Sequence, residues 1–100
     1  MEAIYYILQA LTEPAHGYVL MQRVKELSNG QVRLAAGTLY EAIKNLLSKG
    51  FIAPIPSGDT GRKIYALTRA GREILWKDYQ RMSHMLRITE HVLEKEGELK

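Results

Sequence analysis

Hydrophobic positions recur at helical spacing in several segments of this 100-residue chain. In the segment after residue 35 the apolar residues form one stripe along a predicted helix over residues 36–49, and they are Leu39, Ile43, Leu46 and Leu47. The opposite face is polar and consists of Thr38, Glu41, Asn45 and Ser48, with Tyr40 and Lys44 on the flank. This helix therefore has one face for a core and another face for a polar partner.

Three further helices are predicted over residues 2–11, 17–27 and 69–96. The first ends at Pro14, because proline lacks the backbone N–H and disfavours helix in the preceding residue. The second ends at residues 28–30, where Asn29 or Gly30 can take the left-handed conformation. Thr68 is the expected N-cap of the last and longest helix.

Alternation of polar and apolar residues predicts a short strand over residues 31–34. Residues 51–55 and 62–67 are expected to form a β-hairpin around a turn at 56–61, with Pro54 confining the first arm to a sheet edge. Three helices followed by a hairpin have the order of a winged helix-turn-helix. We predict an α+β fold, mostly α, with a winged-helix domain over residues 1–68 and a C-terminal dimerisation helix over residues 69–100.

The composition excludes several classes of protein. The chain has no cysteine, which removes disulfides, zinc–thiolate sites and thiol nucleophiles and fits a reducing compartment. No apolar run is long enough to span a bilayer, and the N-terminus lacks a basic leader. The expectation is a soluble cytoplasmic protein without a membrane partner.

The net charge of +3 is unevenly distributed. Residues 32–72 contain seven basic and two acidic residues, whereas the rest of the chain contains seven basic and nine acidic ones. Such a basic middle is consistent with one face that binds a polyanion, and equally with chance clustering on a solvated surface.

The predicted helix over residues 36–49 has the shape and chemistry to enter a DNA major groove. Gly37 and Thr38 leave backbone N–H groups near its start free for a phosphate, and Tyr40 can reach a phosphate or sugar. Lys44 and Asn45 are expected to reach base edges, since lysine suits guanine and asparagine suits adenine. An ordinary surface helix is the alternative interpretation of the same pattern.

Two further features bear on DNA binding. Glu41 can accept a hydrogen bond from cytosine N4, or it can repel the DNA backbone and set the register. Arg62 and Lys63 follow the hairpin turn and can lie along the backbone or enter the minor groove. A solvated hairpin tip would have a similar composition.

The terminal helix has a heptad-like apolar stripe that predicts a dimer interface formed by Leu75, Tyr79, Met82, Leu86 and Leu93, with Thr89 in the same row. Packing on the first helix of the same chain is the alternative, and both can occur. Trp76 lies one residue off this stripe and, with Tyr79, could stack on a planar ligand. The favoured role of Trp76 is a core or interface anchor.

No catalytic or metal-binding constellation is evident. His84 and His91 are two helical turns apart without a third ligand, so we expect no metal and no cofactor. The chain has no paired loop carboxylates, no nucleophile with a base and no phosphate-binding glycine loop. It is therefore not expected to be an enzyme.

Four runs of residues resemble PadR-type transcriptional regulators, and they are residues 16–18, 37–40, 46–52 and 61–72. The glycine-threonine-leucine-tyrosine run from Gly37 and the leucine-threonine-x-x-glycine-arginine run from Leu67 are specific in combination. The resemblance implies a bacterial or phage repressor, homodimeric, that binds inverted-repeat operators and is often released by small aromatic or drug-like molecules.

The resemblance also implies residue roles. It places Thr38, Tyr40 and Lys44 among the recognition-helix contacts and Arg62 and Lys63 among the wing contacts. Trp76 and Tyr79 would lie near the effector groove. The chain departs from the family at Glu41, where proline is frequent, and at Pro54 and Pro56, where charged residues are common.

The predicted function is therefore sequence-specific binding of double-stranded DNA by a homodimer that regulates transcription. The alternative function is a winged-helix module that binds a ligand or a protein without binding an operator. Glu41 on the recognition face is the residue that favours this alternative.

Overall fold

The computed structural model of this chain describes residues 2–56 and 61–97. Its elements in chain order are α1 (Glu2–Ala10), β1 (Ala15–His16), α2 (Gly17–Leu27), α3 (Ala36–Ser48), β2 (Ile52–Ile55), β3 (Ile64–Leu67) and α4 (Arg69–Lys95). The helices thus lie within one residue of the predicted bounds. Most of the turn expected at 56–61 lies outside the described residues.

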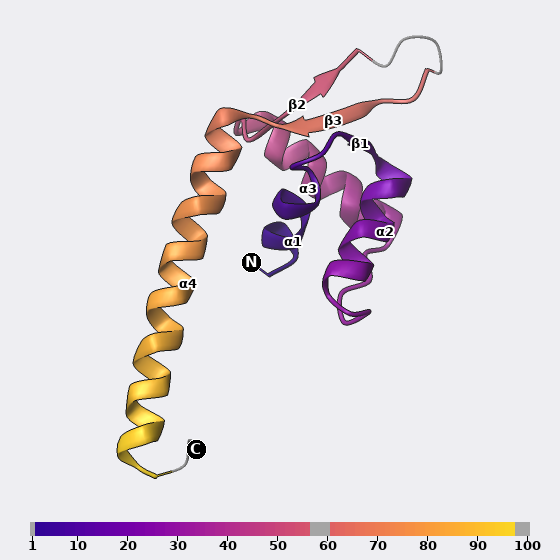
Figure 1. The fold of residues 1–100 in the computed structure, drawn as a ribbon. Helices are drawn as coiled ribbons and strands as arrows, with labels where there is room; N and C mark the ends of the chain where they lie inside the picture. Colours follow the sequence, from indigo (N-terminus) through magenta and orange to yellow (C-terminus); the bar gives the residue numbers. More distant parts are fainter. Residues whose placement is uncertain (1, 57–60, 98–100) are drawn as a thin grey trace.

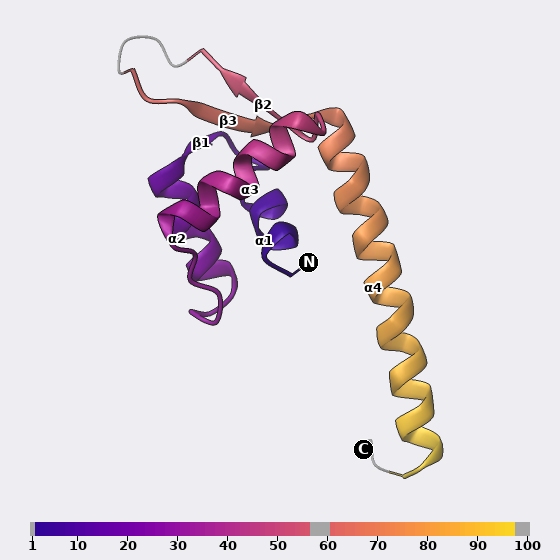
Figure 2. The same cartoon turned by 180° about the vertical axis from the view of Figure 1, so that it is seen from behind.

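Helices α1, α2 and α3 pack together on one side of a small antiparallel sheet with the order β1-β3-β2 (Figures 1 and 2). Each helix contributes its apolar stripe to one core, together with inward-facing residues of the strands. The core side chains with the least exposure are Ile7, Leu8, Leu11, Leu20, Val24, Leu39 and Ile52. The winged helix-turn-helix prediction is confirmed.

The strand predicted over residues 31–34 is wrong, because that segment has no sheet partner in the structure. The Ser28 hydroxyl accepts a hydrogen bond from the backbone N–H of Val32 at 2.9 Å, which ties this segment to the end of α2. Val32 and Leu34 still bury part of their side chains against the core. The third strand is instead β1, where Ala15 pairs with Tyr65 and His16 with Ile64.

The hairpin is confirmed, but its returning strand begins at Ile64 and not at Arg62. The ladder between β2 and β3 runs from Ile52↔Leu67 to Ile55↔Ile64. Pro56 follows β2 and has no N–H to continue the pairing, so Arg62 and Lys63 lie just outside the sheet. Strand β2 is an edge strand, as Pro54 requires.

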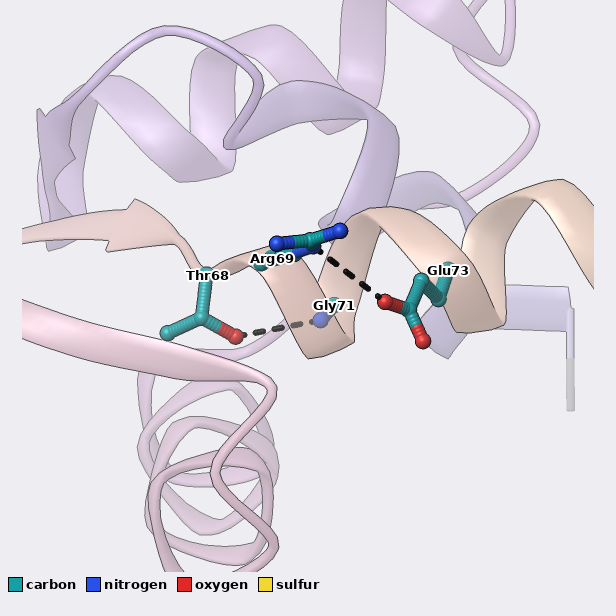
Figure 3. Close-up of polar contacts among 4 residues, drawn as sticks. All are labelled: Thr68, Arg69, Gly71 and Glu73. Carbon is teal, nitrogen blue, oxygen red and sulfur yellow. Dashed lines mark hydrogen bonds and ion pairs between the residues drawn. The ribbon is translucent and has the colours of Figure 1, made fainter.

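The C-terminal end of α3 is joined closely to the start of α4. Gly50 has φ 76°, and the N–H groups of Gly50 and Phe51 donate to Leu47 and Leu46 and close α3. The Thr68 hydroxyl accepts from the Gly71 N–H at 3.0 Å, which confirms Thr68 as the N-cap of α4 (Figure 3). The same hydroxyl donates to the Gly50 carbonyl oxygen at 2.6 Å.

Helix α4 makes the molecule elongated. The principal extents are 59 × 27 × 19 Å, and the radius of gyration is 16.4 Å, compared with about 13 Å for a compact chain of this length. Its first turns pack against α1 and the core, whereas its C-terminal half stands away from the other helices in both views (Figures 1 and 2). Beyond Met85, every described residue of this helix except Leu93 is exposed.

Candidate nucleic-acid interface

Helix α3 exposes a polar crest opposite its buried side. Leu39, Ile43 and Leu46 are at most 2% exposed and fix the helix on the core. The residues on the outer side are all exposed, and they are Gly37, Glu41, Lys44 and Ser48. An exposed helix held rigidly by its apolar stripe is what insertion into a major groove requires.

The structure divides the predicted contact residues between two flanks of α3. Tyr40 lies on the side of α3 that faces the start of α2 and the base of the wing. The wing is the β2–β3 hairpin with the residues that connect its strands. On the opposite side, Thr38, Glu41 and Asn45 border a hollow of about 570 Å³ against α1. Lys44 lies on the crest between these two sides, so the predicted residues are spread around the exposed side of α3 and do not form one cluster.

On the Tyr40 side, α2, α3 and the wing enclose an open cleft of about 610 Å³. Its lining combines phenols, cations and a glycine, and it consists of His16, Gly17, Tyr18, Tyr40, Arg62, Lys63 and Tyr65. The structure thus brings the predicted residues Tyr40, Arg62 and Lys63 to one place. This cleft (the wing cleft below) lies beside the α3 crest.

The wing cleft includes four residues without a predicted functional role, namely His16, Gly17, Tyr18 and Tyr65. Three of them belong to the histidine-glycine-tyrosine run that contributed to the family resemblance, and this run was the available signal. Pairing of β1 with β3 places this run beside the wing. That pairing joins residues about 50 positions apart, which no local pattern could predict.

Two contacts shape the wing cleft. The guanidinium Nη1 of Arg62 lies 3.3 Å from Nε2 of His16, so the base of the wing is linked to the start of α2. Tyr40 lies over Gly17, where a Cβ on the glycine would be 2.9 Å from the phenolic oxygen. Gly17 therefore leaves the space that the Tyr40 ring occupies.

The start of α2 adds positive potential to the wing cleft. Its N-cap residue His16 makes no side-chain capping bond to the backbone N–H groups of the first turn. Those groups and the helix dipole favour an anion. The cleft also contains the exposed phenols of Tyr18 and Tyr40 and the cations Arg62 and Lys63. Together these groups are the hydrogen-bond donors and positive charges that bind a DNA phosphate.

The predicted interface residues of α4 differ in exposure. Leu75 is half-buried and packs on the core of its own chain, and Leu93 is half-buried near the end of the helix. Met82 is half-buried and borders a hollow of about 500 Å³ between α1 and α4. Tyr79 and Leu86 are 50% and 64% exposed. Packing on the same chain, the alternative to a dimer interface, thus applies to Leu75 and Met82, whereas Tyr79 and Leu86 stay exposed.

The two aromatic residues of α4 lie against each other. The rings of Trp76 and Tyr79 are stacked with centroids 5.3 Å apart and an interplanar angle of 26°. Trp76 is 59% exposed, so it is not a core residue of the single chain. An interface and a ligand remain as its two possible partners.

The described residues contain no group of three histidine, aspartate or glutamate side chains placed to hold a metal ion. Within the same ranges, no helix combines the length and the hydropathy that crossing a membrane requires.

The family model of the transcriptional regulator PadR-like family matches residues 5–77 of this chain. A PadR family transcription regulator from Clostridium difficile R20291 superimposes with a TM-score of 0.80 at 26% identity, covering 93% of this chain and 99% of that one. A PadR family regulator from Eggerthella lenta DSM 2243 gives a TM-score of 0.74 at 28% identity, covering 97% of this chain and 82% of that one.

A PadR-like regulator from Bacillus cereus shares the fold, with a TM-score of 0.74 at 20% identity over 90% of this chain and 89% of that one. No curated protein matches the chain.

Proposed function

Since the chain belongs to the PadR-like family of transcriptional regulators, we propose that it represses transcription as a homodimer bound to an inverted-repeat operator. The family consists of regulators and not of enzymes, and DNA is the partner of such a protein. In this proposal residues 1–68 bind DNA and residues 69–100 join two copies. The protein would act in the cytoplasm, where bacterial DNA is accessible.

The observation that carries the proposal is the position of the wing cleft beside the exposed crest of α3. The cleft offers cations, phenols and a helix start to a phosphate, while the crest offers Lys44 to the bases next to it. A ligand-binding module without DNA would not need both features on one side. This arrangement favours operator binding over the alternative function.

The remaining recognition residues receive distinct roles in this proposal. Gly37 and Thr38 at the start of α3 would bring backbone N–H groups and a hydroxyl to a second phosphate on the α1 side. Lys44 and Asn45 would contact base edges. Arg62 and Lys63 would hold the wing on the backbone or in the minor groove.

Dimerisation through α4 is supported by the apolar surface that this helix exposes. Tyr79, Leu86, Ile88 and Val92 are each between 48% and 64% exposed, and the last three follow the turns of α4 that lie beside α1. A second copy would cover this surface around a two-fold axis. The two α3 helices would then enter successive major grooves about 34–36 Å apart.

A small planar aromatic effector would bind near α4. The stacked and exposed pair of Trp76 and Tyr79 offers a flat aromatic surface for such a molecule. Trp76 is the only tryptophan, so its fluorescence reports directly on this position. Quenching of this fluorescence by some members of a panel of planar compounds is expected; an unchanged signal with all compounds would leave Trp76 as an interface anchor.

Operator binding is tested by selecting bound fragments from genomic DNA and titrating the selected fragment and a scrambled copy at two salt concentrations. The expected result is tighter binding of the selected fragment, with an affinity that falls steeply as salt rises because phosphate contacts release counterions. Equal and weak binding of both fragments at both salt concentrations would instead support the module without operator binding.

A further inference from the structure

Glu41 occupies the crest of α3 without a structural partner. It is exposed on the side opposite Leu39 and Ile43, which anchor the helix in the core, and it borders the hollow between α3 and α1. Within residues 2–56 and 61–97 its carboxylate makes no ion pair and no hydrogen bond, not even with Lys44 three residues on. The fold therefore gives no reason for an acidic residue at this position.

The helix dipole does not account for Glu41 either. Helix α3 begins at Ala36, so Glu41 is its sixth residue and lies beyond the first turn, where a carboxylate is stabilised. A negative charge in the middle of a DNA-binding face weakens attraction to phosphates. It is compatible with tight binding only where the helix meets base edges that donate a hydrogen bond.

The start of α3 lacks bulky side chains. Ala35, Ala36 and Gly37 are all exposed, and none has a side chain longer than a methyl group. Gly37 does not have a positive φ, and a Cβ added to it would meet nothing within 4 Å. Neither backbone conformation nor internal packing therefore requires a glycine here. The missing side chain leaves room for a DNA base or phosphate to come close to the backbone of α3.

The direction of helical side chains places Glu41 over this opening. Side chains lean toward the N-terminus of their helix and cover the turn before their own Cα. The turn before Glu41 contains Gly37, which has no side chain to block the carboxylate. Glu41 is thus the first long side chain on the crest that a base would meet when α3 enters a groove by its start.

We propose that Glu41 is a specificity-determining residue that accepts a hydrogen bond from N4 of a cytosine in each operator half-site. The inference rests on the proposed function, since it requires α3 to lie in the major groove. Cytosine presents only a donor there, whereas guanine presents two acceptors and adenine adds an N7 acceptor beside its donor. A carboxylate is attracted by the first pattern and repelled by the acceptors of the other two.

The test measures base preference and not affinity alone. Binding of the wild type, Glu41→Gln and Glu41→Ala is compared on the selected operator and on variants with each base pair substituted in turn. The matched control is Glu26→Gln, which removes the same charge from an exposed position near the end of α2. Circular-dichroism melting confirms that the variants are folded.

For the wild type, one C·G pair in each half-site is expected to be preferred by roughly 5- to 150-fold over the other base pairs. Glu41→Gln and Glu41→Ala should lose that preference while the other positions keep theirs, and Glu26→Gln should change nothing. If both Glu41 variants bind all sequences more tightly by the same factor, Glu41 acts through its charge and the inference is wrong. If the wild type itself selects no sequence, the proposed function fails first.

Discussion

The phenol of Tyr40 lies so close over Gly17 that a Cβ on the glycine would be 2.9 Å from its oxygen. One residue belongs to α3 and the other begins α2, so this contact lies where the two helices meet at the wing cleft. Tyr40 is 54% exposed, so its ring can move away at little cost in packing. The glycine therefore positions a candidate phosphate ligand more than it stabilises the fold.

Gly17→Ala is expected to weaken operator binding by roughly 5-fold, the equivalent of one hydrogen bond of about 1 kcal/mol. The added methyl group displaces the Tyr40 hydroxyl, while the free energy of unfolding changes little. Fluorescence anisotropy with the operator and urea unfolding measure the two effects.

Tyr40→Phe provides the control for Gly17→Ala. It should cause a similar loss of affinity, and the double variant should lose no more than either single variant, because both remove the same contact. Additive losses would show that Gly17 acts on DNA binding by another route.

Gly71→Ala is expected to destabilise the protein by about 3 kcal/mol or more. Its Cβ would run into the backbone carbonyl oxygen of Phe51 and lie 2.6 Å from Cδ1 of Leu67, and neither can move freely at the joint with α4. Gly37→Ala is the matched control, because its methyl group would enter open space and improves helix propensity by up to about 1 kcal/mol. Urea unfolding should separate the two variants; similar stabilities would contradict the tight packing at Gly71.

Sequence patterns predict the helices well because each helix has an apolar stripe and is bounded by residues close in the sequence that begin or end it. Gly50 and Thr68 are examples, since each ends or begins a helix through bonds to residues within five positions. The strand predicted at residues 31–34 is absent because alternation of polar and apolar residues does not by itself provide a neighbouring strand. The backbone N–H of Val32 donates instead to the Ser28 hydroxyl.

The wing cleft could be predicted only in part. Tyr40, Arg62 and Lys63 were identified from their residue types and positions in helix and hairpin. His16 and Tyr18 were not, because their place beside the wing depends on the two-residue strand β1 and its pairing with β3. A strand that short has no periodicity from which to predict it.

Lys44→Ala is expected to relax base specificity, with a loss of roughly 1–3 kcal/mol on the operator and less on scrambled DNA. Lys44 is exposed on the crest of α3, where a long cation can reach guanine acceptors. Lys77→Ala, which removes an exposed lysine from α4, is the control and should leave binding unchanged. Equal weakening on operator and scrambled DNA would identify Lys44 as a phosphate ligand instead.

Leu86→Glu is expected to yield monomers, because a carboxylate replaces the leucine that is most exposed on α4 and would be buried by a second copy. Multi-angle light scattering measures the change, and operator affinity should fall with it. Gln80→Glu introduces the same charge at another exposed position of α4, outside the apolar stripe, and should remain dimeric. A dimeric Leu86→Glu would place the interface elsewhere.

Hydroxyl-radical footprinting on the selected operator tests the central claim, symmetric DNA binding by two winged helices, most directly. Two protected half-sites that form an inverted repeat are expected, with centres about 10–10.5 base pairs apart or a multiple of that spacing. In Leu86→Glu the two protections should weaken together. A single protected half-site, or uniform protection of any DNA, would show that the protein does not bind DNA as a symmetric dimer.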